Sequence, residues 1–237
     1  DVGITQSGGY VSQWSDQSGY ARHAIQRYSS YQPSYSSGGA CLTCDGVNSG
    51  FLSNSSAFVS SVFSVVVVLK PQQKSTTQST IMDFGVASIY FDSNSMALKC
   101  KLPSNTAITM YTLTADTMYI LTITIMLTGS TGTYYPKVQL NVNGNTQYPL
   151  TAAPTSVTYN TFTVKTINIG GTSPSTTYNG SIYSIVLYTS NDSGITKTEG
   201  YLAWKWFGNG TILPSTHAYY NVSPLDVGAQ FNPKSVT

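Results

Sequence analysis

The residues that could carry out acid–base or nucleophilic chemistry are few in this chain of 237 residues. It has one glutamate, Glu199, eight aspartates and two histidines, His23 and His217. Glycoside hydrolysis needs two carboxyl groups about 5–10 Å apart, and no two acidic residues lie within three positions of each other. A serine nucleophile would be expected in a Gly-x-Ser-x-Gly turn, which the sequence lacks. We therefore predict a protein that is not an enzyme.

The cysteines and acidic residues show no metal-binding pattern. Cys41 and Cys44 form a Cys-x-x-Cys, but a zinc site needs two further ligands at similar spacing. The three cysteines are therefore either buried free thiols or include one disulfide, from Cys100 to Cys41 or Cys44. Calcium is the one ion that stays open, because its oxygen ligands need not form a run in sequence. No residue is assigned to it.

Low charge limits the classes of partner. Charged residues make up 8 % of the chain, against about 25 % in ordinary domains, and the net charge is +2. The sequence has no cluster of lysine and arginine residues that could bind nucleic acid by charge. Its longest apolar run, near residues 62–69, is too short for a membrane-spanning helix. A surface rich in hydroxyl and amide groups favours an extracellular or virion-surface location. Because the chain begins at Asp1, we interpret it as a processed product or an excised domain.

Alternating apolar and polar residues indicate an all-β chain. Residues 62–69, 119–128 and 138–142 are predicted strands, and residues 162–169 are predicted to form a single bulged strand. An Asn-Gly turn at 143–144 starts a hairpin, whose returning strand carries Pro149 and so lies at a sheet edge. Only residues 196–206 have a helical pattern. We predict one domain, residues 1–225, followed by an extended tail or linker, residues 226–237.

Four motifs resemble one known family. They are Trp14-Ser15-Asp16-Gln17-Ser18-Gly19 near the start, the strand at 63–70, the hairpin at 140–144 and, most specific, the closing Glu199-Gly200-Tyr201-Leu202-Ala203-Trp204-Lys205-Trp206. Their order resembles the concanavalin A-like lectin/glucanase superfamily, in particular the laminin-G-like jelly-roll modules of phage, large DNA virus and bacterial surface proteins. The resemblance implies a two-sheet antiparallel β-sandwich, a jelly roll, with one short C-terminal helix.

The first of these motifs is typical of a structural turn. Asp16 is expected to accept backbone N–H bonds, and Gly19 to allow a positive φ. Trp14 is expected to pack against the sheet. A ligand site at this turn is the alternative interpretation.

The closing motif also has a structural interpretation. Glu199 lies near the predicted helix start, where a negative charge favours the helix dipole. Leu202 and one indole, of Trp204 or Trp206, are expected to pack over an open end of the sandwich. His217 follows in a predicted loop and is expected at the surface.

Tyrosines in predicted loops are the candidates for ligand contacts. Sugars place their C–H faces on aromatic rings and form hydrogen bonds with planar amides and carboxylates. The candidates are Tyr28, Tyr31 and Tyr35 in one loop and Tyr134 and Tyr135 in another. Tyrosine is equally suited to protein interfaces, and a loop tyrosine can also simply pack on the sheet.

These observations favour a non-catalytic glycan-binding or adhesion module on a viral or cell surface, with a polysaccharide or glycoconjugate as its partner. The alternative is a virion structural protein, capsid- or tail-associated, that packs the sandwich against other virion or surface proteins. A glycan hydrolase is the third and least supported hypothesis. The fold that the resemblance implies supports all three functions, so residues at a site must decide between them.

Overall fold

The computed structural model describes residues 3–36, 38, 40–47, 52–54, 57–73, 77–103, 106–190 and 194–225. The predicted tail, residues 226–237, lies outside the described residues. The described chain is mostly β-strand with one α-helix, as the alternating pattern predicts. No helix in this part has both the length and the hydropathy needed to cross a membrane.

Short strands follow one another along the described chain. The first are β1 (Ile4–Ser7), β2 (Tyr10–Trp14), β3 (Ala24–Ile25), β4 (Ser34–Ser36), β5 (Cys41–Asp45), β6 (Leu52–Asn54) and β7 (Phe58–Ser60). The central ones are β8 (Val62–Pro71), β9 (Ser79–Asp83), β10 (Ser88–Phe91), β11 (Ala97–Lys101), β12 (Ala107–Thr112), β13 (Tyr119–Ser130), β14 (Thr133–Val142) and β15 (Asn145–Ala152). The last are β16 (Phe162–Val164), β17 (Ile167–Ile169) and β18 (Asn179–Tyr188), followed by the helix α1 (Gly194–Phe207). Two single 3-10 turns are η1 (Ser29–Tyr31) and η2 (Pro174–Thr176).

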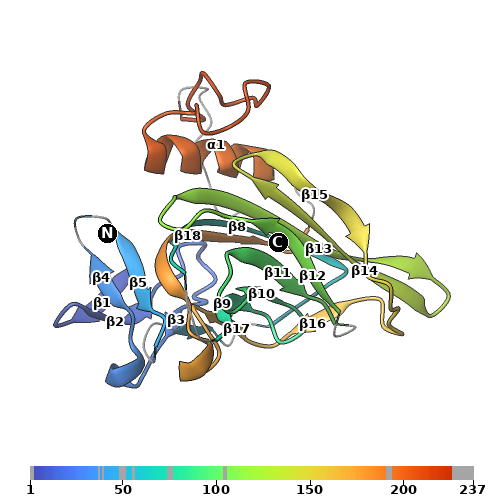
Figure 1. The fold of residues 1–237 in the computed structure, drawn as a ribbon, viewed down its shortest axis with the longest axis horizontal. Coiled ribbons are helices and arrows are strands. Elements are labelled where there is room, and N and C mark those ends of the chain that lie inside the picture. The colour runs from blue at the N-terminus through green and yellow to red at the C-terminus, as the bar shows by residue number, and fades with distance from the viewer. Residues whose placement is uncertain are drawn as a thin grey trace.

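Sixteen of the described strands form one antiparallel sheet that folds over on itself. Its order is β12-β11-β10-β9-β17-β6-β3-β2-β4-β5-β18-β8-β13-β14-β15, with β1 beside β2. Figure 1 shows the ends of this path as two stacked layers, with β8, β13, β14, β15 and β18 above and β9 to β12 below. The sequence leads us to expect two separate sheets. Instead, the short strands β6, β3, β2, β4 and β5 join the layers into one hydrogen-bonded path.

The strand β8 divides its side chains between two cores. Phe63, Val65 and Val67 belong to the large apolar cluster between the layers. Val66 and Val68 lie on the opposite face, in a smaller cluster with residues of α1. Because β8 lies between β13 and β18 and is covered on both faces, it carries buried apolar residues on both faces, as the sequence predicts for a central strand.

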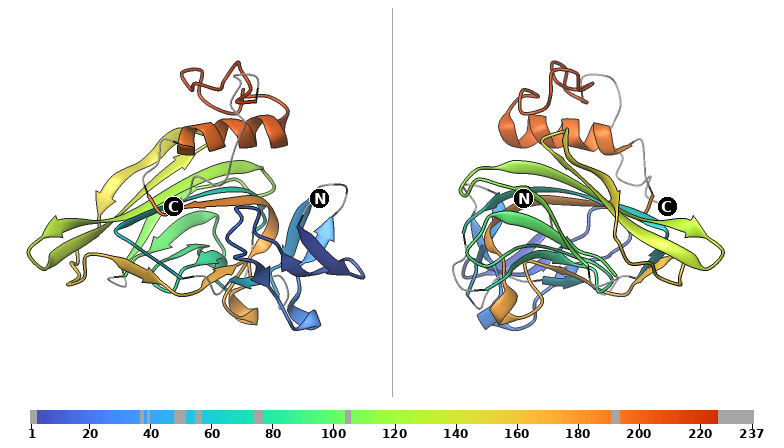
Figure 2. Two further views of the ribbon diagram at one scale, coloured as in Figure 1. Left: turned by 180° about the vertical axis from the view of Figure 1, so that it is seen from behind. Right: turned by 45° about the vertical axis from the view of Figure 1, so that its right-hand side comes forward.

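The helix α1 lies across the outer face of the upper layer (Figures 1 and 2). Leu202 is buried there, and the indole N–H groups of Trp204 and Trp206 donate to the Tyr219 carbonyl, at 3.0 Å, and to the Ser184 hydroxyl, at 2.9 Å. The expectation that the helix packs over an open end of the sandwich was therefore wrong. The apolar residues on both faces of β8 predict that both faces are covered. They do not predict that α1 covers one of them.

Residues 162–169 form two strands rather than one bulged strand. β16 pairs with β7 in a separate small sheet, whereas β17 pairs with β6 and β9 of the main sheet. The change of side-chain parity therefore marks a break between two sheets. The edge position predicted from Pro149 is confirmed, because β15 ends the path of the main sheet.

The three cysteines are buried free thiols, one of the two alternatives that the sequence leaves open. Burial raises the pKa of the Cys100 thiol to about 12. Burial, followed by the negative charge of Asp45, also raises the pKa of Cys44. Since the thiolate is the nucleophile and the metal ligand, neither cysteine is suited to redox or metal chemistry in the folded chain.

Candidate ligand-binding site

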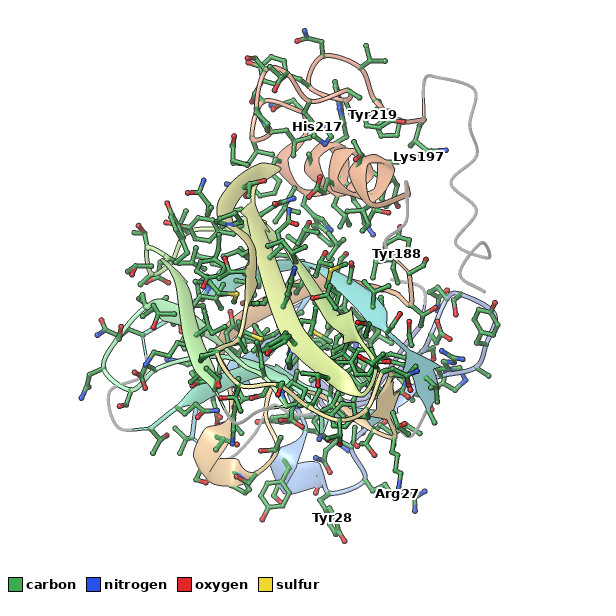
Figure 3. The ribbon with its side chains drawn as sticks, turned by 90° about the vertical axis from the view of Figure 1, so that its right-hand side faces the viewer. Arg27, Tyr28, Tyr188, Lys197, His217 and Tyr219 are labelled. Atoms are coloured by element: carbon green, nitrogen blue, oxygen red, sulfur yellow. The ribbon has the colours of Figure 1, made fainter. Side chains whose placement is uncertain are left out.

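A hollow of ≈ 390 Å³ lies where β3 and η1 meet the edge of β6. It contains two of the five candidate tyrosines and is lined by His23, Ile25, Gln26, Arg27, Tyr28, Tyr31 and Ser53. Figure 3 shows Arg27 and Tyr28 at the end of the molecule opposite α1, with their side chains directed away from the body of the protein. The aromatic rings and polar groups that sugars require thus lie together in this segment.

The turn that begins at Trp14 fixes one side of this hollow. Asp16 accepts hydrogen bonds from the Ser18 N–H and hydroxyl, at 2.8 and 2.7 Å, and from the Arg22 N–H, at 3.0 Å. The Asp16 N–H donates to Nδ1 of His23, at 3.1 Å. Gly19 has a φ of +91°, a conformation that glycine adopts without strain. The turn therefore sets the position of the chain from Arg22 onward.

The buried Gln26 side chain fixes the other side of the hollow. Gln26 is 5 % exposed, and its side-chain oxygen accepts the Tyr28 N–H, at 3.1 Å. Its backbone N–H donates to the Ser12 carbonyl, at 2.9 Å, and its carbonyl accepts the Gln32 side-chain amide, at 3.0 Å. The Tyr28 ring meets the Tyr31 ring edge-on, with centroids 6.2 Å apart. The Tyr28 ring is therefore both exposed and held on an ordered backbone.

The acidity of Asp16 gives a test of how this turn is held. Burial opposes ionisation, but hydrogen bonds from Ser18 and Arg22, together with the Arg22 charge, hold the pKa of Asp16 below its ordinary 3.8. A carboxyl with a lowered folded-state pKa contributes stability above its ordinary pKa and loses it as the pH falls through the folded-state pKa.

Asp16→Asn is therefore expected to be less stable than the parent by about 1–2 kcal/mol near neutral pH. The difference between the two proteins should shrink when the pH falls below 3.8. Urea unfolding midpoints at about pH 6 and about pH 3 measure both values. A difference of the same size at both values would show that the ionised carboxylate does not hold the turn.

The other candidate tyrosines lie elsewhere. Tyr35, on β4, packs against the large core, and its hydroxyl is buried without a hydrogen-bond partner among the described residues. Tyr134 and Tyr135 begin β14 at the far end of the β13–β14 hairpin, on the side opposite β2 and β3 in Figure 1. Tyr134 packs partly into the core and pairs through its backbone with Val157, whereas Tyr135 is 41 % exposed. The five tyrosines therefore do not form one site.

A second hollow, of ≈ 260 Å³, lies between β9, β17 and the end of β16. It is lined by Asp83, Phe84, Gly85, Val86, Thr163, Lys165, Thr166 and Asn168. Its one aromatic residue, Phe84, is fully buried in the core. This hollow therefore offers no ring on which a sugar could stack, so the first hollow is the better candidate.

Glu199 and His217 form a buried pair under the closing loop, residues 208–225, which follows α1. The Thr122 hydroxyl donates to Oε1 of Glu199, at 2.6 Å, and Nε2 of His217 lies 3.4 Å from Oε2. Nδ1 of His217 accepts the Tyr219 N–H, at 3.2 Å, so the proton of a neutral ring lies on Nε2, toward the carboxylate. Both side chains are about 5 % exposed. They join the helix, the sheet and the closing loop.

This arrangement corrects two expectations. Glu199 lies within the helix and is buried against the sheet, rather than at the helix start, and His217 is buried rather than at the surface. The sequence offers one signal that could have indicated this pairing: a lone glutamate in an apolar helix face requires a partner. The described residues contain no group of three or more His, Cys, Asp or Glu side chains that could hold a metal ion.

No family model and no curated protein matches the chain, but solved structures resemble it. A botulinum neurotoxin type C structure aligns with a TM-score of 0.55 and 12 % identity over 81 % of this chain and 48 % of its own. A Trypanosoma rangeli sialidase gives 0.48 and 13 % over 83 % and 31 %, and a Limulus polyphemus pentraxin 0.44 and 11 % over 68 % and 80 %. The chain spans about half the length of the toxin chain and less than a third of the sialidase. At these identities the toxin likeness concerns the fold alone.

Proposed function

We propose that this chain is a non-catalytic glycan-binding module with a concanavalin A-like jelly-roll fold, and that the hollow lined by His23, Tyr28 and Tyr31 is its binding site. One observation carries the proposal. Tyr28 is 70 % exposed, the largest exposed fraction of any large hydrophobic side chain that the structure describes, and yet its backbone is held by the buried Gln26. A large ring exposed on an ordered support loses little conformational entropy when it is covered by a ligand.

The surroundings of Tyr28 combine apolar and polar groups, as a sugar site requires. The hollow combines the two tyrosine rings with the imidazole of His23 and the hydroxyl of Ser53. A ring supplies a flat apolar surface for the C–H face of a sugar, and the other groups supply hydrogen bonds for its hydroxyls. Cell entry of the botulinum neurotoxin type C depends on its interaction with two ganglioside molecules. Glycan recognition is therefore compatible with a similar fold.

Tyr28→Ala is expected to weaken binding to the preferred glycan at least tenfold, which corresponds to about 1.4 kcal/mol. The matched control is Tyr135→Ala, because Tyr135 is also exposed but lies at the far end of the β13–β14 hairpin. A glycan array identifies the ligand, and titration calorimetry then compares the three proteins. If neither variant changes the affinity, or if Tyr135→Ala has the larger effect, the site is wrongly placed. A reducing-sugar assay with turnover above background would contradict a non-catalytic role.

We propose an extracellular or virion-surface location for this module, because its surface is low in charge and rich in hydroxyl and amide groups. The second candidate function is a virion structural protein, capsid- or tail-associated. It is favoured by β15, which ends the sheet path and is exposed along almost its whole length, including Leu150. An edge strand of this kind can pair with a strand of another protein. A fixed copy number in a symmetric particle, with β15 covered by a neighbour, would favour this function.

A further inference from the structure

We propose that the hollow at residues 23–31 selects glycans that carry a carboxylate, with Arg27 as the residue that binds the acid. This inference rests on the proposed function and adds the chemical class of the ligand. It begins from the placement of charge. The whole chain has two arginines, Arg22 and Arg27, and both lie in this one segment. Arg27 lines the hollow, and no acidic residue does so.

The two arginines differ in whether their charge is already used. Arg22 lies over the Tyr20 ring, with its guanidinium carbon 5.0 Å from the ring centroid. Burial raises the pKa of Asp16, and the charge of Arg22 acts together with the hydrogen bonds from Ser18 and Arg22 to lower it. Arg27 makes no ion pair among the described residues and is exposed. The carboxylate of Asp16, in the turn that precedes the hollow, is occupied by Ser18 and the Arg22 N–H. The charge of Arg27 is therefore available to a ligand.

The remaining lining groups favour a ligand that accepts hydrogen bonds. Because Nδ1 of His23 accepts the Asp16 N–H, a neutral His23 ring has its own N–H at Nε2. The side-chain oxygen of Gln26, an acceptor that a sugar hydroxyl could otherwise use, already accepts the Tyr28 N–H. The hollow thus presents a guanidinium, an imidazole N–H and hydroxyl groups. An ionised carboxylate only accepts hydrogen bonds, and its planar pair of oxygens matches the guanidinium fork.

A nucleic acid does not fit this site. Backbone phosphates are bound by several lysines and arginines along a surface, whereas this hollow has one available arginine and the chain carries a net charge of +2. A single carboxylate beside an apolar sugar face matches one arginine beside one exposed tyrosine ring. Sialic acids and uronic acids share this chemistry.

The test compares acidic probes with neutral counterparts of the same size. The intact chain is titrated with 3′-sialyllactose and its methyl ester, and with trigalacturonic acid and its methyl ester. We expect at least one acid to bind tenfold or more tightly than its counterpart, and the acid that does so identifies the source of the carboxylate. Added salt should lower the affinity for the acidic probe more than the affinity for the neutral one.

Arg27→Gln is expected to reduce this preference to within about twofold, and Arg27→Lys to restore only part of it, because an ammonium lacks the planar fork. The matched control is Lys101→Gln, which removes an exposed positive charge on β11, four strands from β6. It should leave the preference unchanged. Arg27 is exposed, so thermal melts should show that Arg27→Gln is folded.

The outcomes separate the two proposals. If acids and neutral counterparts bind equally well and Tyr28→Ala weakens both, the proposed function stands and the carboxylate preference is wrong. If the preference survives in Arg27→Gln, the acid is bound by another residue and this inference is wrong. If no glycan of either kind binds, the proposed function itself fails.

Discussion

Glu199→Ala is expected to lower the free energy of unfolding by about 2–4 kcal/mol, because it removes the acceptor of two buried polar groups, and each unsatisfied buried group costs about 1–3 kcal/mol. The substitution leaves the Thr122 hydroxyl and the Nε2 atom of His217, both on buried side chains, without their carboxylate. It also weakens the contact between α1 and the closing loop, where His217 and Tyr219 lie. Figure 3 shows these two residues directly above the helix.

The appropriate control is another paired carboxylate at the surface. Asp92 pairs with Lys99, and the Asp92 side chain is 45 % exposed. Exposed pairs contribute about 0–1 kcal/mol, so Asp92→Ala should change stability by less than about 1 kcal/mol. Urea unfolding of both variants, with Glu199→Gln as a version that keeps an acceptor for Thr122, measures the contrast. Equal effects at the two sites would mean that Glu199 is not a buried anchor.

Phe63→Ala is expected to cost about 3–5 kcal/mol through the cavity that it opens in the main core. Phe63 is fully buried on β8, and its ring lies 4.9 Å from that of Phe84, 5.4 Å from that of Phe162 and 5.6 Å from that of Phe58, measured between centroids. The ring thus joins the upper layer to the turn that follows β9, to β16 and to β7, so its loss affects both layers.

Two further variants make this prediction testable even if Phe63→Ala does not fold. Phe63→Leu keeps part of the volume and should lose clearly less stability than Phe63→Ala. Val59→Ala, on β7 beside the same cluster, removes a side chain that is 64 % exposed and should change stability by no more than about 0.5 kcal/mol. A loss below about 1 kcal/mol for Phe63→Ala would place the core elsewhere.

The sequence predicts the regular parts of this fold well. The alternation at residues 119–128 predicts that Leu121, Ile123 and Ile125 share one face, and all three lie in the main core. The single helix and the edge strand carrying Pro149 are also found where expected. These features depend on local periodicity, which a single strand or helix expresses by itself.

Contacts between distant segments could not be predicted in the same way. The partners of Glu199 are Thr122, on β13, and His217, in the closing loop. Nothing in the helix sequence specifies either of them. The candidate tyrosines illustrate the same limit: Tyr28 and Tyr35 are seven residues apart, yet one is exposed beside a hollow and the other packs against the core. Which loop residues form a site depends on how β3, β4 and β6 are paired, and that pairing is set by the whole sheet.

The most direct test of the central claim is a crystal structure of this chain with the glycan that binds most tightly on an array. We predict that a sugar ring lies against Tyr28 in the hollow that Tyr31 and Arg27 also line. A sugar seated instead on Tyr135 at the far hairpin, or in the hollow beside Asp83 and Lys165, would contradict the assignment.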